Sequence, residues 1–441
     1  MAKLSNPAVI SFLVKPNHPD YDVLVSQSID ARRLFNSLNA VARESFSQRK
    51  DSNGDTHISK SLGLLDWITS KPNLALTYGY ESIRKIIETK QDIRLPQKIA
   101  QRVGVSVATS WKSYYGLRKV NPKANPPRFK QKYGLVEYTK QAISGVGIKT
   151  GFVIPSGWSQ GVRLPAHIDS ATIQSARLLH SHGNVFKLEV IYLRKEPSTV
   201  SETGLSAGID LGVDTLAMIA YGDTSIRPLR VDGRKIKSIN AYYNKQIAAL
   251  TSKYDKEVKN IRNKNPELDV FKIRSHRSAT LWAKRDRKIN HLLHTASATI
   301  IKQLSRTGVD TLIIGWSAGF KQGMAMGKRN NQNFAYLPLA RFRDMLKYKA
   351  EQAGLRVLIQ EESYTSKSSF LDNDSLPVYG QVNEKPFFSG RRFTRGQYRS
   401  STGLVIHADV NGALNILRKS KQPMRLCNGI IVMPQRLAIT T

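Results

Sequence analysis

The chain has 441 residues, of which 40% are hydrophobic and 8% aromatic, so it can bury two or three cores and is not expected to be disordered. Lys and Arg number 68 against 33 Asp and Glu, which gives a net charge of +35 spread over the whole length and predicts a polyanionic partner, nucleic acid rather than a membrane. One cysteine, Cys427, excludes an internal disulfide and a thiolate zinc site within one chain, and the lack of an apolar run of 18 residues or a leader-like segment predicts a soluble, intracellular protein.

The N-terminal part of the sequence predicts a β-rich domain interrupted by helices. Residues 8–14 form a β-prone run, and further short β-prone runs after residue 145 are typical of a small barrel. Between them, apolar residues recur at helical spacing. We therefore expect a β-rich domain formed by residues 1–20 and 121–200, split by a helical lobe of residues 21–120.

The linker at residues 119–132 is rich in proline and in basic residues. It places the aromatic Phe129 between Arg128 and Lys130, and cations beside an aromatic ring suit a phosphate backbone with stacked bases. A solvated connector is the alternative for such a linker. Farther along, residues 196–204 hold a proline and several Ser and Thr, which predicts a domain boundary.

Two acids that follow or begin regular elements are candidates for catalysis. An apolar run ends in GIDLG at residues 208–212, which predicts a buried strand that presents the Asp210 carboxylate to a cleft. Asp409 stands at the head of a helix predicted for residues 410–419. Carboxylates on rigid elements can hold a pair of Mg²⁺ ions at a scissile phosphate. The alternative is that Asp210 is a turn residue and Asp409 a helix N-cap.

Between these acids the sequence predicts long helices at residues 236–250 and 281–304, a strand at 311–314, a helix at 339–353 and a strand at 356–360. The second long helix carries basic residues that can guide a nucleic-acid strand or form an ordinary solvated face. They are Lys284, Arg285, Arg287 and Lys288. The order strand, hairpin, helices, strand, helix, strand, helix is that of an RNase H-like fold. An α/β domain with a mixed sheet flanked by helices is therefore predicted.

Three segments of the C-terminal half carry a resemblance to a known family. They resemble the RuvC-type nuclease segments of the TnpB family and occur in the same order, at residues 208–212, 361–367 and 408–417. Proteins of this family are transposon-encoded RNA-guided nucleases, also called OrfB transposases, and are related to type V CRISPR effectors. The N-terminal half matches only by its layout, a β-rich wedge domain split by a helical recognition lobe, and by residues 126–130.

This resemblance implies a RuvC-like nuclease domain formed by residues 201–364 and 405–441, with a basic helical insertion at about 231–305. It implies a DNA endonuclease that uses Mg²⁺ or Mn²⁺, bound by Asp210, Asp409 and a third carboxylate. The implied partners are a guide RNA and a DNA target in double-stranded and single-stranded form, and the implied location is the prokaryotic cytoplasm, in association with the nucleoid.

One departure from the family pattern concerns its zinc ribbon, which has four cysteines between the second and third nuclease segments. The aligned positions here hold Ser369, Asp372, Arg399 and Thr402. We therefore expect residues 365–404 to form a basic target-strand-loading insertion without zinc, ordered by contact with nucleic acid or else a floppy loop. The residues of this insertion expected to bind nucleic acid are Arg391, Arg392 and Arg395.

The second departure concerns the catalytic glutamate, which the family carries at a strand end where this chain has Gly315. The neighbouring strand runs into Glu361 and Glu362, and adjacent strands lie about 4.8 Å apart, so a side chain from this strand can supply the missing carboxylate. Successive strand residues point to opposite faces, so one of the two is expected to do so, and we favour Glu362. The alternatives are that both are surface acids or that the nuclease is impaired.

The leading function is thus an RNA-guided DNA endonuclease that cuts DNA next to a short flanking motif by two-metal RuvC chemistry. The first alternative binds RNA and DNA without cleavage, as a nuclease-dead repressor or a transposition accessory protein. A structural RNA-binding protein ranks last, because it leaves the pairing of Asp210 with Asp409 to coincidence.

Overall fold

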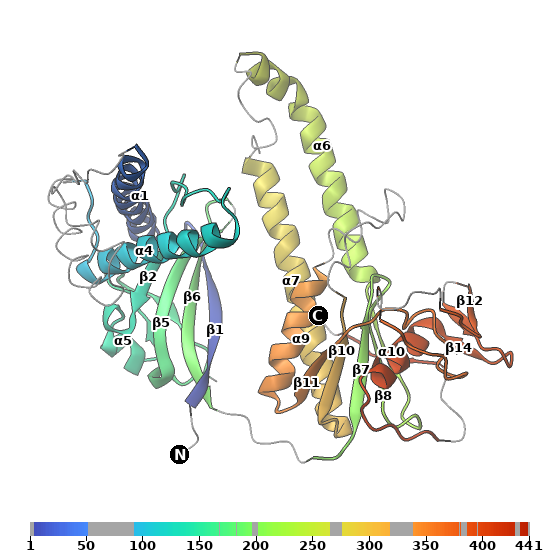
Figure 1. Ribbon diagram of the computed structural model, residues 1–441. Coiled ribbons are helices and arrows are strands. Elements are labelled where there is room, and N and C mark those ends of the chain that lie inside the picture. The colour runs from blue at the N-terminus through green and yellow to red at the C-terminus, as the bar shows by residue number, and fades with distance from the viewer. Residues whose placement is uncertain are drawn as a thin grey trace. The chain divides into compact units, whose positions relative to one another are not determined.

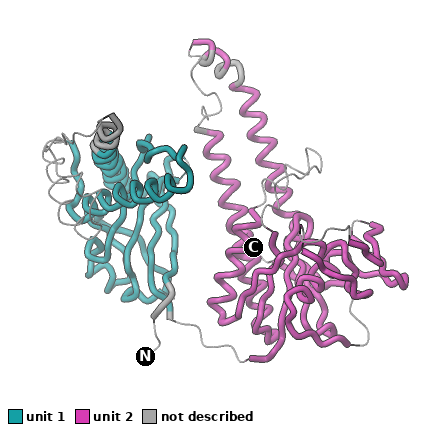
Figure 2. The backbone as a smooth tube through the Cα atoms, viewed as in Figure 1, with its two compact units in different colours: residues 1–196 teal, residues 197–441 magenta. Residues whose placement is uncertain are grey.

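The computed structural model divides the chain into two compact units, residues 1–196 and residues 197–441, which are coloured separately in Figure 2. The residues that the structure describes are 4–51, 92–166, 168–181, 183–195, 202–264, 276–317, 338–378, 380, 386–394, 396–427 and 433–439. None of the helices in these stretches is long and apolar enough to cross a membrane.

Unit 1 is built on a four-stranded antiparallel sheet with the order β1-β6-β5-β2. Its strands are β1 (Leu4–Val14), β2 (Val136–Thr139), β5 (Ile173–His180) and β6 (Phe186–Lys195). The predicted barrel is wrong, because among the described strands β1 and β2 are open edges with one neighbour each. Four strands are too few to enclose a core, and helices pack on the sheet instead.

The helices that complete this core are α1 (Tyr21–Asp51) and α4 (Gln97–Val120), and Figure 1 shows α4 crossing beside the ends of the strands. Leu38 and Trp111 are fully buried (0%) in the core shared with the strands. The Trp111 indole also donates a hydrogen bond to Asn39 Oδ1 (3.0 Å), which ties α4 to α1. The shorter elements of unit 1 are η1 (Lys140–Ala142), α5 (Gly145–Lys149), β3 (Phe152–Val153), β4 (Val162–Arg163) and η2 (Ser170–Thr172).

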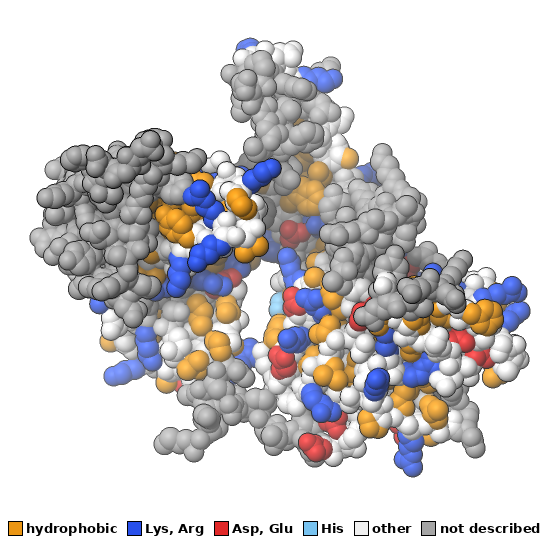
Figure 3. Space-filling view, in the orientation of Figure 1, with side chains coloured by type: hydrophobic (Ala, Val, Ile, Leu, Met, Phe, Trp, Pro, Cys, Tyr) orange, Lys and Arg blue, Asp and Glu red, His pale blue; other side chains and the backbone are white. Residues whose placement is uncertain are grey.

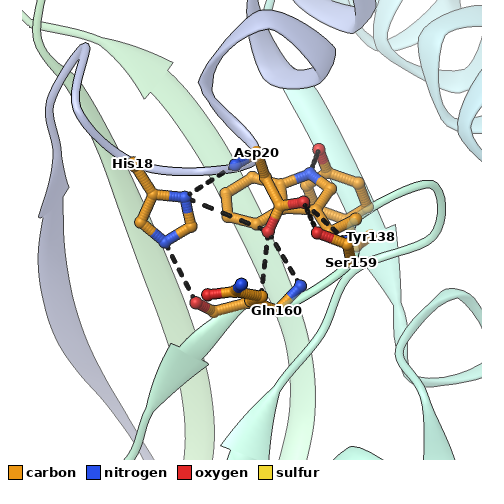
Figure 4. Close-up of polar contacts among 7 residues, drawn as sticks. His18, Asp20, Tyr138, Ser159 and Gln160 are labelled. Atoms are coloured by element: carbon orange, nitrogen blue, oxygen red, sulfur yellow. Dashed lines mark hydrogen bonds and ion pairs between the residues drawn. The ribbon is translucent and has the colours of Figure 1, made fainter.

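A hydrogen-bonded clasp at Asp20 joins the start of α1 to the loop between β3 and β4 (Figure 4). The Asp20 side chain is 2% exposed, and it accepts hydrogen bonds of 2.6–3.0 Å from the hydroxyl and amide of Ser159 and the amides of Gln160 and Gly161. His18 closes the turn by accepting from the Asp20 amide (3.1 Å). Burial alone would raise the pKa of Asp20, but these hydrogen bonds outweigh it and lower the pKa to about 2. Ser159 donates to Asp20 rather than to His18, so the three residues form a structural clasp and not a nucleophile with its base.

Unit 2 contains a six-stranded mixed sheet with the order β11-β10-β7-β8-β9-β15 (Figure 1). Its strands are β7 (Ser206–Leu211), β8 (Thr215–Tyr221), β9 (Leu229–Asp232), β10 (Thr311–Gly315), β11 (Arg356–Gln360) and β15 (Gln435–Arg436). β7, β8 and β9 are antiparallel neighbours, whereas β10 and β11 run parallel to β7. The carboxyl ends of β7, β10 and β11 therefore meet at one edge of the sheet.

Helices cover both faces of this sheet, as predicted. They are α6 (Arg234–Lys264), α7 (His276–Thr307), α9 (Leu339–Gln352) and α10 (Ala408–Lys419). Strand β10 shows how the faces divide, because Leu312 and Ile314 are buried in the core formed with α7 and α9, whereas Ile313 is buried in the core formed with α10. α10 thus covers one face, together with buried residues of the segment before it, Phe370, Tyr398 and Ile406.

The insertion before α10 contains a small antiparallel sheet of β12 (Arg391–Thr394), β13 (Gln397–Arg399) and β14 (Val405–His407). Tyr398 is 1% exposed, and its hydroxyl donates to the carbonyl of Lys367 (2.7 Å). β14 runs directly into α10. The alternative of a floppy loop is therefore wrong for the described part of the insertion, which is packed against the rest of unit 2.

Candidate active site

Asp210 lies near the end of β7 on the face of the sheet that α10 covers. Its cross-strand partner is Met218 of β8, whose buried side chain belongs to the core formed with α10, and directly paired residues point to the same face. A glycine of α10, Gly412, lies against it: a Cβ at this position would be 2.9 Å from Asp210 Oδ2. The glycine therefore lets the helix approach the carboxylate.

Asp409 lies in the first turn of α10. The helix cap is the preceding His407, whose Nδ1 accepts from the Asp409 amide (3.2 Å), so the alternative of Asp409 as the N-cap is wrong. The Asp409 carboxylate accepts from the Thr215 hydroxyl (2.8 Å) and lies 3.3 Å from Nη2 of Arg392. β8, α10 and the insertion thus all contribute to holding this carboxylate.

Glu362 follows β11 and occupies the space beside Gly315, at the end of β10. A Cβ built at Gly315 would lie 2.4 Å from Ile416 Cδ1 and 2.9 Å from Glu362 Oε2, so the carboxylate lies directly beside the position of residue 315, with Ile416 on α10 closer still. Glu361 has a different environment, because its carboxylate binds Lys419 Nζ and the Ser363 amide, each at 2.6 Å. Burial raises the pKa of Glu361, but these contacts outweigh it and hold the pKa below its ordinary value.

The charges of Asp409 and Glu362 act on the Asp210 carboxylate. Burial, followed by the negative charges of Asp409 and Glu362, raises the pKa of Asp210 well above its ordinary value, and Arg392 offsets only part of this effect. Burial and the charge of Glu361 raise the pKa of Glu362 to about 7, although a hydrogen bond from the Ser317 amide works in the opposite direction. A buried carboxylate among like charges favours a proton or a metal cation nearby.

A cavity of about 470 Å³ opens beside Asp210 and Asp409. Its other lining residues are Gly212, Val213, Asp214, Thr215, Arg230, Arg392, Gly396 and His407. Glu362 does not line it and approaches Asp210 from the β10 side. Within the described ranges, no three side chains of His, Cys, Asp or Glu are already gathered as ligands of one metal ion. The oxygen ligands suit Mg²⁺ or Mn²⁺, and a bound ion would have to draw them together.

The basic residues predicted on α7 divide into two groups. Lys284, Arg287 and Lys288 are exposed, as a binding face requires. Arg285 is only 6% exposed, and its Nε donates to Asn240 of α6 (2.8 Å), so its assignment to that face is wrong. The sequence shows Arg285 among basic neighbours, but it does not show that the side chain binds Asn240 of α6. Figure 3 shows Lys and Arg side chains spread over the visible face of each unit rather than gathered at one place.

The linker of unit 1 packs along α1. Asn36 exchanges two hydrogen bonds with the backbone of Lys130 (2.8 and 2.9 Å), and Arg43 donates to the carbonyl of Pro127. Phe129 remains 47% exposed, with the Arg43 guanidinium 5.0 Å from its ring centre. Arg128 and Lys130 line a surface cavity together with Phe129. This part of the linker is therefore a fixed segment rather than a solvated connector.

The insertion presents Arg391 and Arg392 on exposed strand β12, whereas Arg395 lies outside the described residues. Hydrogen bonds join the two loops at which the family has cysteines. Asp372 accepts from the amide (2.9 Å) and hydroxyl (2.6 Å) of Ser401, and its own amide donates to Ser369 (3.2 Å).

Four residues that line the cavity were missed by the sequence reasoning. They are Asp214, Thr215, Arg230 and His407. Asp214 and Thr215 follow GIDLG closely, and His407 lies two positions before Asp409, so proximity to the motifs was the available signal. Lys237 of α6 forms a close ion pair with Asp214. Arg230 has a weaker signal, a charged residue within the apolar strand β9.

Comparisons with known proteins agree with one another. Residues 189–319 match the OrfB_IS605 family, described as a probable transposase, and residues 340–416 match the family described as Cas12f1-like, TNB domain. The chain is 28% identical over 214 residues to the TnpB-like protein ORF457 of Acidianus two-tailed virus. This match covers 48% of the chain and 41% of the relative, so it spans less than half of either protein.

Solved structures give weaker similarities. A Cas12f1–sgRNA–target DNA complex aligns with a TM-score of 0.49 and 14% identity, covering 90% of this chain and 82% of that chain. The mini-RNA-guided endonuclease CRISPR-Cas_phi3 aligns with a TM-score of 0.34 and 9% identity, covering 97% and 94%. C2c1 of Alicyclobacillus acidoterrestris, in complex with single-guide RNA, aligns with a TM-score of 0.33 and 9% identity, covering 90% and 69%.

Proposed function

We propose that the chain is a TnpB-type RNA-guided DNA endonuclease that cuts its target next to a short flanking motif, an interpretation that the two family matches and the TnpB-like relative support. The observation that carries the proposal is the group of three acids, Asp210, Asp409 and Glu362, whose charges raise the pKa of Asp210. Structural acids in the same chain, such as Asp20, are instead surrounded by donors.

The proposed nuclease domain is RuvC-like and consists of residues 201–364 and 405–441. Its support is the strand order β11-β10-β7-β8-β9, with an antiparallel hairpin unit followed by two parallel strands, which is the arrangement expected of an RNase H-like sheet. In this proposal residues 365–404 load the target strand. Unit 1 supplies the wedge domain and the recognition lobe that bind the guide.

Mg²⁺ or Mn²⁺ fits the chemistry of the site, because its acids offer hard oxygen ligands and Arg392 offsets only part of the effect of burial and of the neighbouring acids on Asp210. Asp210, Asp409 and Glu362 would hold the ions. When bound, they would neutralise these acids, activate water and stabilise the leaving oxygen of a phosphodiester. The chain's own contribution is orientation: Thr215 and Arg392 fix the Asp409 carboxylate, and β7 and α10 fix the two aspartates on rigid elements.

Glu362 is proposed to replace the glutamate that the family carries at the position of Gly315. The supporting geometry is that the Glu362 carboxylate lies beside Gly315, 2.9 Å from the place of a Cβ at this residue. Glu361 is instead bound to Lys419 and Ser363. The two glutamates are therefore a matched pair, alike in chemistry and adjacent in sequence but different in environment.

The proposed partners are a guide RNA and a DNA target, double-stranded before opening and single-stranded at the cut, in the prokaryotic cytoplasm with the nucleoid. The net charge of +35 supports them, because RNA and DNA backbones both need neutralising. Protein purified from its host should carry RNA, and sequencing of that RNA should return one defined guide. Binding to unrelated nucleic acid should weaken steeply with salt, and RNA-free protein with salt-insensitive binding would contradict the proposal.

Cleavage by the purified ribonucleoprotein, measured on supercoiled target DNA with Mg²⁺ or with EDTA, tests the activity. Asp210→Ala and Glu362→Gln should abolish cutting and preserve target binding, whereas the matched control Glu361→Gln should cut. If Glu362→Gln cuts at the wild-type rate, the relocated glutamate is wrong.

A nuclease-dead repressor or transposition accessory protein is the second candidate. Two observations favour it: Gly315 stands at the family's glutamate position, and the described residues hold no ready-made set of three metal ligands. A wild-type complex that binds its target and never cuts would establish this candidate.

A further inference from the structure

The cavity beside Asp210 and Asp409 also has a basic side, formed by Arg230 and Arg392. The pairing register of the strands explains how Arg230 reaches the cavity. Asp210 of β7 pairs with Met218 of β8, and Met218 pairs in turn with Arg230 of β9. The three residues form one row across the sheet and point to one face, with Asp210 and Arg230 two strand spacings apart, about 10 Å.

The alternation along β9 gives the same orientation independently. Leu229 and Val231 are buried in the core formed with α7 and α9, so Arg230 between them points to the opposite face, toward the cavity and α10. Met218, which stands between Asp210 and Arg230 in this row, is fully buried (0%). Neither the core formed with α7 and α9 nor the core formed with α10 includes Arg230.

The Arg230 guanidinium has an unmet hydrogen-bond requirement. Its Nε is buried and has no hydrogen-bond partner in the part of the chain that the structure describes. Asp409, the acid on the same cavity wall, instead contacts Arg392 (3.3 Å). A buried donor beside an open cavity is accounted for by a ligand that accepts.

We infer that Arg230, assisted by Arg392, binds the phosphate group of the DNA strand at its cutting point, on the side of the cavity opposite Asp210. The inference rests on the proposed function and deepens it by assigning a residue to the substrate. A guanidinium presents donors in a planar fork that matches two non-bridging phosphate oxygens, and a phosphate fits the separation between the arginine and the acids. Arg230 would contact the phosphate directly, whereas the acids would hold the cations.

Binding of a terminal phosphate tests this without any cleavage. The full-length protein is titrated, with Ca²⁺ in place of Mg²⁺, into two fluorescent single-stranded oligodeoxynucleotides that differ only in a 5′-phosphate or a 5′-hydroxyl. Wild-type protein should bind the phosphorylated strand about tenfold more tightly, the value of one good charge-assisted contact. Arg230→Gln should bind both strands equally, and Arg230→Lys, which keeps the charge without the fork, should fall between.

Arg227→Gln is the matched control, because Arg227 is exposed on the loop before β9, does not line the cavity, and loses the same charge. It should weaken binding of both strands to the same extent and keep the preference. A wild-type protein without preference, or a preference that survives in Arg230→Gln, overturns the inference. If Arg230→Gln fails to fold, an undiminished preference in Arg230→Lys overturns it.

A measurement with inorganic phosphate distinguishes the two candidate ligands of Arg230, a DNA strand and a free phosphate ion. One outcome is that millimolar phosphate raises the unfolding temperature of the wild type but not of Arg230→Gln, while the wild type shows no preference for the phosphorylated strand. That result would assign the site to free phosphate and overturn the assignment to DNA. Because cleavage is not read, a protein that never cuts can still pass or fail these tests.

Discussion

Asp20 in unit 1 and Asp210 in unit 2 are both buried aspartates, but their surroundings are opposite. Asp20 accepts four hydrogen bonds from one loop, and its pKa is lowered to about 2. Asp210 lies among other acids, and its pKa is raised well above the ordinary value. The first carboxylate stabilises its fold as an anion, whereas the fold disfavours the anionic form of the second.

This difference distinguishes a structural acid from a functional one more clearly than burial or sequence position does. A fold gains nothing from placing Asp210 beside Asp409 and Glu362, because repulsion and desolvation both oppose the ionisation of Asp210. Such a group persists where chemistry requires it. The comparison therefore predicts that substitution of Asp210 will reduce activity without reducing stability, whereas substitution of Asp20 will reduce stability.

The largest expected effect is on cleavage. Asp210→Asn should reduce the rate of target cutting by on the order of 1,000-fold or more, because a neutral amide no longer holds a metal cation. Its thermal unfolding temperature in metal-free buffer should equal or exceed that of the wild type. Parallel cleavage and calorimetry measurements check this, and a variant that is inactive because it is unfolded would break the comparison.

The next effect is on the stability of unit 1. Asp20→Asn should lower the free energy of unfolding by roughly 2–4 kcal/mol, since the amide carries no charge and cannot accept all four hydrogen bonds. The sign follows from the pKa: an acid at about 2 when folded and 3.8 when unfolded contributes stability above pH 4, and this is lost as the pH falls toward 2. Denaturant titrations between pH 2 and 6 measure it, and equal curves for both proteins would count against the clasp.

Glu362 should show the opposite pH dependence. Its pKa of about 7 in the folded protein exceeds the ordinary 4.5, so wild-type stability should fall as the pH rises from 4.5 to 7 in metal-free buffer. Glu362→Gln should therefore be more stable than the wild type by roughly 1–3 kcal/mol at pH 8, with no difference at pH 4. Glu361→Gln, which breaks the contact with Lys419, should not gain stability at pH 8.

The smallest effect concerns zinc. The loops that resemble a zinc ribbon are joined here by Asp372 and Ser401, so a zinc-specific chelator should leave the unfolding temperature unchanged. Elemental analysis of the folded protein should find no stoichiometric zinc. Asp372→Ala should instead destabilise the insertion, and a stoichiometric zinc content would contradict this prediction.

Sequence reasoning located the acids because they follow elements with strong local signals. Asp210 lies near the end of an apolar strand, and Glu362 follows the strand that neighbours Gly315, so sheet geometry was enough to place them on neighbouring parts of the sheet. Their role as metal ligands stays a prediction. The prediction of a barrel was wrong because short β-prone runs do not specify the strands with which they pair. Arg285 failed for a similar reason, since only the packing of α6 on α7 reveals Asn240 as its partner.

Binding of Mn²⁺, followed by electron paramagnetic resonance in titrations of the wild type, Asp210→Asn, Glu362→Gln and Glu361→Gln, tests the central claim most directly. The claim is that the acids of unit 2 are held for divalent cations. Wild type and Glu361→Gln should bind Mn²⁺, whereas Asp210→Asn and Glu362→Gln should lose at least one bound ion. Equal binding by all four proteins, or no binding by the wild type, would contradict the account.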